Sequence, residues 1–93
     1  MMSLILDGAW ELGPGVAIRP ERFGALVYSF HTRRLTFLKS KRLLEIVQTL
    51  ADHPSGRAAC AAAGVAESEL GTYERALGTL VDSDVIVPRS DER

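Results

Sequence analysis

The sequence has a single cysteine, Cys60, among its 93 residues. One chain therefore cannot form an internal disulfide or a metal or iron–sulfur site built only from cysteines, which suits a reducing compartment. Long apolar runs are also missing: Leu4-Ile5-Leu6 ends at Asp7, and no stretch approaches the roughly 20 apolar residues of a membrane span. We expect a cytoplasmic protein with no membrane segment.

A surplus of charge of either sign is absent, because the formal net charge is -1. Such a chain presents no broad positive surface to nucleic acid or to an anionic membrane, so neither is expected as a partner. The charge is nevertheless uneven. Residues 1–57 carry 8 basic and 5 acidic side chains, whereas residues 58–93 carry 3 and 7.

Convergent ionisable groups, which an enzyme needs, are scarce. His31, His53 and Cys60 are not spaced as a nucleophile–base pair or as metal ligands. Cys60 stands among alanines, which is typical of a small buried packing residue. We expect no catalytic residues, no cofactor and no metal.

Residues 1–93 are predicted to form one domain, because so short a chain cannot divide its apolar side chains between two cores. The ends, 1–9 and 89–93, are expected to be flexible. Trp10 either anchors the N-terminal segment on the domain, which we favour, or presents a partner surface. Alternating apolar residues predict three short strands, and the short turns between them predict an antiparallel meander. The strands are expected around residues 16–18, 26–30 and 35–37.

From Ser40 the apolar period changes from 2 to 3.6, which predicts helices. These are expected from Ser40 to just before Pro54, from Gly56 to Ala63 and from Glu67 to Leu80. Ser40 and Ser55 are the expected N-caps, and Gly64 is the expected C-terminal stop. The run Val85–Val87 predicts a wing-like strand or a capping segment. The fold class is α+β: a three-stranded antiparallel sheet packed on a three-helix bundle, of winged helix-turn-helix type.

Helix, turn, helix and a terminal strand are also typical of DNA-binding proteins. The predicted helix Glu67–Leu80, however, holds Glu67, Glu69 and Glu74 against the single Arg75, and has no Asn, Gln or Lys to contact base edges. A regulator that binds DNA or another protein is therefore the alternative hypothesis. The favoured one is a peptide-binding module.

An open meander leaves one edge of its third strand unpaired, and that edge is a template for an incoming strand or for a homodimer. Basic residues gather beside it, at Arg33, Arg34, Lys39, Lys41 and Arg42. Two interpretations stay open. The first takes the basic residues as a solubilising rim that protects the edge, and the second takes them as a binding site for an acidic peptide.

Two segments resemble the family of mycofactocin chaperones, which are PqqD-like. They are Arg19–Tyr28, reading Arg-Pro-Glu-Arg-Phe-Gly-Ala-Leu-Val-Tyr, and Phe37–Ser40, reading Phe-Leu-Lys-Ser. The resemblance implies a non-catalytic domain that binds the leader of a ribosomally made precursor peptide. It also implies delivery of that peptide to a radical S-adenosylmethionine (SAM) maturase, which would hold the iron–sulfur cluster and the S-adenosylmethionine.

The resemblance further implies a site, since related domains add the leader as a strand beside the third strand and pack it on the third helix. On this sequence, main-chain hydrogen bonds would come from Leu35, Thr36, Phe37 and Leu38. Apolar groove contacts would come from exposed parts of Leu70, Tyr73 and Leu77. Pairing with leader carboxylates would fall to Arg33, Arg34 and Lys39.

Overall fold

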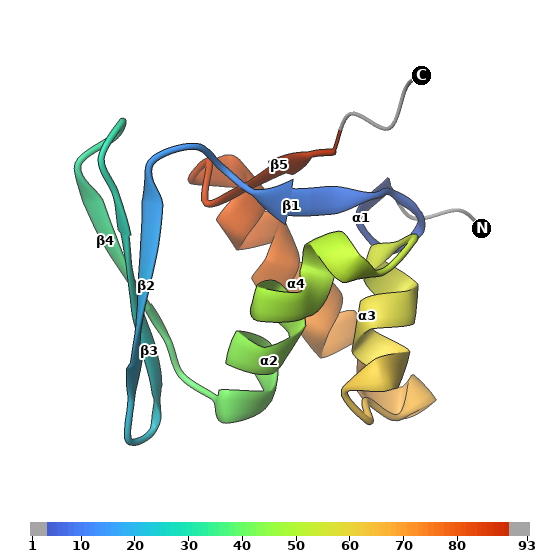
Figure 1. Cartoon of the computed structure of the whole chain (residues 1–93). Coiled ribbons are helices and arrows are strands. Elements are labelled where there is room, and N and C mark those ends of the chain that lie inside the picture. Colours follow the sequence, from blue (N-terminus) through green and yellow to red (C-terminus); the bar gives the residue numbers. More distant parts are fainter. Residues whose placement is uncertain (1–3, 90–93) are drawn as a thin grey trace.

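The structure is a computed structural model that describes residues 4–89 (Figure 1). Its elements in chain order are α1 (Leu4–Asp7), β1 (Trp10–Leu12), β2 (Val16–Glu21), β3 (Gly24–Ser29), β4 (Arg34–Leu38), α2 (Lys41–Thr49), the 3-10 turn η1 (Leu50–Asp52), α3 (Gly56–Ala62), the 3-10 turn η2 (Glu67–Glu69), α4 (Leu70–Asp82) and β5 (Ile86–Pro88). This is an α+β fold, as expected. No helix in the described part of the chain is both long and apolar enough to cross a membrane.

The predicted antiparallel meander is confirmed as a sheet of order β2-β3-β4. The connection between β2 and β3 has only two residues, Arg22 and Phe23, and β3 then begins at Gly24. Gly24 has a φ of 158°, and a Cβ atom there would overlap the carbonyl oxygen of Leu38. Glycine is required at this point because β3 and the end of β4 approach so closely.

One face of this sheet packs on the helices and the other does not. Ala25, Val27 and Ser29 of β3 are at most 1% exposed, and they point to the side on which Figure 1 shows all the helices. The intervening residues Leu26 and Tyr28 point to the opposite face and are half-buried. The alternation follows from the period of two in a strand.

The helices begin and end close to the predicted positions. The Ser40 hydroxyl oxygen accepts a hydrogen bond from the Leu43 amide at 2.9 Å, and that of Ser55 accepts one from the Ala58 amide at 3.1 Å. Both serines are therefore N-caps, as predicted. Gly64 has a φ of 85°, which is the left-handed stop expected after α3.

A second sheet was not predicted. β1 and β5 pair antiparallel, with Trp10 opposite Pro88 and Leu12 opposite Ile86. The Val85 amide donates to the Leu80 carbonyl at 2.9 Å and closes the end of α4, whereas Ile86 and Val87 belong to a strand outside the main sheet. It joins a strand at the other end of the chain.

Residues near both expected loose ends are held by specific contacts. Leu6 in α1 is buried, and the Trp10 indole N–H donates to the Ile5 carbonyl at 2.8 Å, so Trp10 is the anchor that the sequence predicted. The Arg89 amide donates to the Ala9 carbonyl at 2.9 Å. Residues 1–3 and 90–93, the outermost parts of the two segments, lie outside the described residues.

The core lies between the sheet and the helices. It is made of buried apolar side chains from both layers and from the β1-β5 ribbon: Leu6, Trp10, Ala25, Val27, Leu38, Ile46, Val47, Leu50, Ala59, Cys60, Leu77, Leu80, Val85 and Ile86. Cys60 is fully buried, as predicted. Desolvation by burial raises the pKa of its thiol, and the positive charge of Arg57 partly opposes that shift.

Candidate functional site

A groove of about 390 Å³ runs beside β4, on the side of the sheet that faces the helices. Its lining combines one strand and two helices: Thr36, Phe37, Leu38, Lys39, Leu43, Ala76, Thr79 and Leu80. Leu38 and Leu80 are buried and belong to the core, so they form its floor. Ala76 and Thr79 have small side chains, and these leave space between α4 and β4.

The main chain of β4 has an edge with no neighbouring strand, because β4 is last in the order β2-β3-β4. The Arg33 amide donates to the Ser29 carbonyl at 2.8 Å, whereas the Phe30 amide donates toward β2, to the Gly15 carbonyl at 2.9 Å. The main-chain N–H and C=O groups of β3 therefore point to β4 at one residue and to β2 at the next.

The register carries this alternation onto β4. Leu35 and Phe37 lie opposite Tyr28 and Leu26, whose main-chain groups point to β2. The N–H and C=O groups of Leu35 and Phe37 therefore point to the free edge. Thr36 lies opposite Val27 and directs its main chain to β3. Half of the predicted hydrogen-bonding set is thus oriented for an added strand, and Thr36 and Leu38 are not.

The other free edge of the sheet, on β2, differs in one residue. Pro20 has no N–H, and it lies opposite Ala25, whose main-chain N–H and C=O groups point to β4. The missing donor is therefore on the outer side of β2. Proline at such a position is a common protection of an edge against strand addition. β4 contains no proline, so its edge is the more complete template.

Positive charge lies at both ends of β4. Lys39 lines the groove and is exposed, and Arg33 and Arg34 are exposed at the hairpin end. Arg33 adopts a left-handed φ of 59°, which the four-residue turn from Phe30 to Arg33 requires. The Arg42 guanidinium lies 3.5 Å from the Glu69 carboxylate, so its charge is partly matched.

The family model for the peptide chaperone MftB family matches residues 9–87. The chain belongs to this family. Curated MftB-family proteins share about half of its residues. The "Peptide chaperone MftB" of Mycolicibacterium smegmatis is 51% identical over 86 residues, covering 92% of this chain and 84% of the relative. That of Mycobacterium tuberculosis is 52% identical over 83 residues, covering 89% and 76%. No solved structure was found to match significantly.

Membership of the MftB family confirms the resemblance given by residues 19–28 and 37–40 and places the chain among the chaperones of mycofactocin biosynthesis. The family is non-catalytic, as expected from the lack of convergent ionisable groups. Among residues 4–89, His, Cys, Asp and Glu nowhere gather in threes that could hold a metal ion.

Among the third-helix residues predicted for the groove of this MftB-family chain, Leu77 needs correction. Leu77 has no exposed surface, so it cannot offer an apolar contact to a ligand. Leu70 and Tyr73 are half-buried against the core, and they are not among the groove-lining residues. The reason is helical geometry: the stripe that recurs at residues 70, 73 and 77 is the face that packs inward.

Sequence reasoning missed Leu43, Ala76, Thr79 and Leu80 in the groove. A helix turns by about 100° per residue, so Ala76 and Thr79 each lie one position from the core residues Leu77 and Leu80. The only available signal was a pair of small residues at a spacing of three beside the apolar stripe. Nothing in that pattern distinguishes a groove from ordinary surface.

Proposed function

We propose that this chain binds the leader segment of a ribosomally synthesised precursor peptide as an extra strand beside β4, and delivers it to a radical SAM maturase in mycofactocin biosynthesis. The observation that carries the proposal is the groove of about 390 Å³ lying along a free strand edge. An added strand makes main-chain hydrogen bonds at the edge and places alternate side chains in the adjoining groove.

Three further observations support this proposal. The relatives are named peptide chaperones, and they match nearly the whole chain. The sheet followed by three helices agrees with a PqqD-like, winged helix-turn-helix arrangement. The exposed basic side chains at both ends of β4 suit a leader that carries carboxylates.

The steps of binding follow from the site. Leu35 and Phe37 offer two N–H donors and two C=O acceptors along the edge. Apolar leader side chains that point toward the helices would enter the groove over Leu43 and Leu80. Lys39 would attract a leader carboxylate and speed association. A leader that is disordered when free loses conformational entropy on binding, so moderate affinity is expected.

Delivery needs no chemistry from the chaperone. A leader held on a domain that also contacts the maturase keeps the reactive part of the peptide at a high effective concentration near the enzyme. The bound peptide then reaches the maturase as an intramolecular event. The iron–sulfur cluster and S-adenosylmethionine would belong to the maturase.

Proline substitution at Phe37 tests strand addition. Phe37→Pro removes an N–H that points to the free edge, and Phe37→Ala removes the same ring but keeps the N–H. One lost main-chain hydrogen bond costs about 1–3 kcal/mol when its partner stays unsatisfied, so Phe37→Pro should bind at least about fivefold more weakly than Phe37→Ala.

The measurement is calorimetric titration of each variant with a synthetic leader of the mycofactocin precursor peptide, with thermal unfolding recorded in parallel. Thr36 is unsuitable for this test because its main chain faces β3, and proline there would disrupt the sheet. If folded Phe37→Pro and Phe37→Ala bind the leader equally, strand addition at β4 is wrong. Duplex DNA is titrated as the control for the alternative hypothesis.

A further inference from the structure

The face of the three-stranded sheet that points away from the helices is unusually apolar. We call it the outer apolar face, and it consists of Phe23, Leu26, Tyr28, Phe30, Leu35 and Phe37. Four of the five most exposed large hydrophobic residues of the described chain belong to it: Phe23 at 71%, Leu35 at 65%, Phe30 at 62% and Phe37 at 45%. Exposed apolar surface of this kind marks interaction sites.

The residues of the outer apolar face lie together because of the strand register. Leu26 is opposite Phe37, and Tyr28 is opposite Leu35. The rings of Tyr28 and Phe30 meet edge to face, with their centroids 4.9 Å apart. The face is therefore one continuous surface spanning β3, β4 and the β2-β3 turn.

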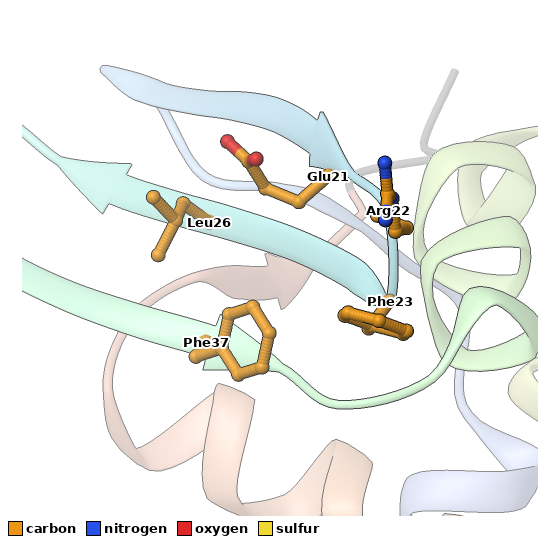
Figure 2. A pocket seen from close by; sticks show the side chains of 5 residues that line it. All are labelled: Glu21, Arg22, Phe23, Leu26 and Phe37. Carbon is orange, nitrogen blue, oxygen red and sulfur yellow. The ribbon is translucent and has the colours of Figure 1, made fainter.

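A depression of about 480 Å³ lies at one end of this face, lined by Glu21, Arg22, Phe23, Leu26 and Phe37 (Figure 2). Figure 1 shows no helix on this side of the sheet. The depression and the groove beside β4 are on opposite sides of the sheet, and Phe37, on the edge strand, lines both. They share no other lining residue, so the two hollows can receive different partners.

The charges around the outer apolar face favour an acidic partner. The Arg19 guanidinium lies 3.3 Å from the Glu21 carboxylate, so these two charges compensate each other. Arg22, next to Phe23, is exposed, and it takes part in none of the ion pairs among residues 4–89. Two copies of this chain joined by this face would bring both Arg22 side chains to one interface, which like-charge repulsion opposes.

We propose that the outer apolar face docks the enzyme that receives the bound peptide, through apolar side chains on that enzyme bordered by carboxylates. The inference rests on the proposed function, because a delivering chaperone must contact peptide and enzyme at the same time. It adds the surface: the enzyme binds the face of β3 and β4 that the leader groove leaves free.

The test uses Phe23→Ser, which removes the most exposed aromatic ring of the face, and Arg22→Glu, which reverses its neighbouring charge. Leu4→Ser is the matched control, because Leu4 is 88% exposed but lies in α1, away from the sheet. Binding of the purified radical SAM maturase and of the synthetic leader is measured separately for each full-length variant. Thermal unfolding confirms that each is folded.

We expect Phe23→Ser and Arg22→Glu each to weaken maturase binding at least about tenfold and to leave leader binding within about twofold. Arg22→Glu should also reduce the salt dependence of maturase binding. Leu4→Ser should bind both partners as the wild type does.

Maturase binding that is indifferent to Phe23 and Arg22, with leader binding intact, overturns the docking surface and leaves the proposed function standing. If maturase binding needs both residues but the chain does not bind the leader, the docking surface stands and the proposed function is overturned. A wild-type dimer in sedimentation that Phe23→Ser dissociates would assign the face to a second copy, and this too overturns the proposal.

Discussion

Filling the groove from the helix side is the most direct perturbation of the proposed peptide site. Ala76 lines the groove and is half-buried, and its side chain is a single methyl group. Ala76→Gln adds a methylene and a carboxamide group, four non-hydrogen atoms that can extend toward β4, and it adds no charge. The longer side chain occupies space that an apolar leader side chain would otherwise take.

The expected loss of affinity follows from the burial of one side chain. Complete burial of a Val- or Leu-sized side chain contributes about 1.5–3 kcal/mol, so its exclusion weakens binding about 10- to 150-fold. The cost to folding is much smaller, because glutamine follows alanine by only a few tenths of a kcal/mol in helix propensity. For a domain of this size that lowers the unfolding midpoint by about 1–3 °C.

Calorimetric titration of Ala76→Gln with the synthetic leader measures the effect. Ala61→Gln is the matched control, since Ala61 is an exposed alanine of α3 that does not line the groove. The control should bind like the wild type. If Ala76→Gln is folded and binds the leader within twofold of the wild type, the groove does not hold leader side chains and the reasoning fails.

Three other predictions concern charge, close packing and the buried thiol. Lys39→Ala should lower the association rate of an acidic leader and reduce the salt dependence of that rate, with a smaller change in the dissociation rate. Stopped-flow kinetics at two ionic strengths measures both rates, and an unchanged salt dependence would place the relevant cations elsewhere. Gly24→Ala should lower the free energy of unfolding by about 1–3 kcal/mol in denaturant titration, because its Cβ would overlap the Leu38 carbonyl oxygen; wild-type stability would mean that the two strands separate at little cost. Cys60 should resist iodoacetamide in the native protein at pH 8 and react once the chain is unfolded, because burial both shields the thiol and raises its pKa. Mass spectrometry measures the labelling, and rapid labelling of the native protein would contradict the burial of Cys60.

Most of the local structure was predictable because it depends on short-range rules. Ser40, Ser55 and Gly64 cap helices through contacts within a few residues of themselves. The break before the second strand was predicted over Pro20 to Gly24, and the structure narrows it to the two residues Arg22 and Phe23. Periodicity then identified the inward faces of the helices.

What sequence reasoning missed depends on contacts between distant segments. β1 and β5 have three residues each, too few to show alternation, and they become a sheet only because the fold brings the two ends of the chain together. The groove depends on the distance between α4 and β4, which no period encodes. Leu77 is the clearest example, because it belongs to the apolar stripe that was assigned to the ligand surface, yet its side chain is buried in the core.

The alternation along β4 links the two proposed sites. An added leader strand would place every second side chain in the groove and the others on the opposite side, beside Leu35 and Phe37 on the outer apolar face. A loaded chaperone would thus present a larger docking surface than an empty one. By thermodynamic linkage, the leader must then raise the affinity for the maturase by the same factor as the maturase raises the affinity for the leader. Titrations of each partner with and without the other measure the two factors independently, and a coupling factor of one would mean that the outward leader side chains do not contact the enzyme.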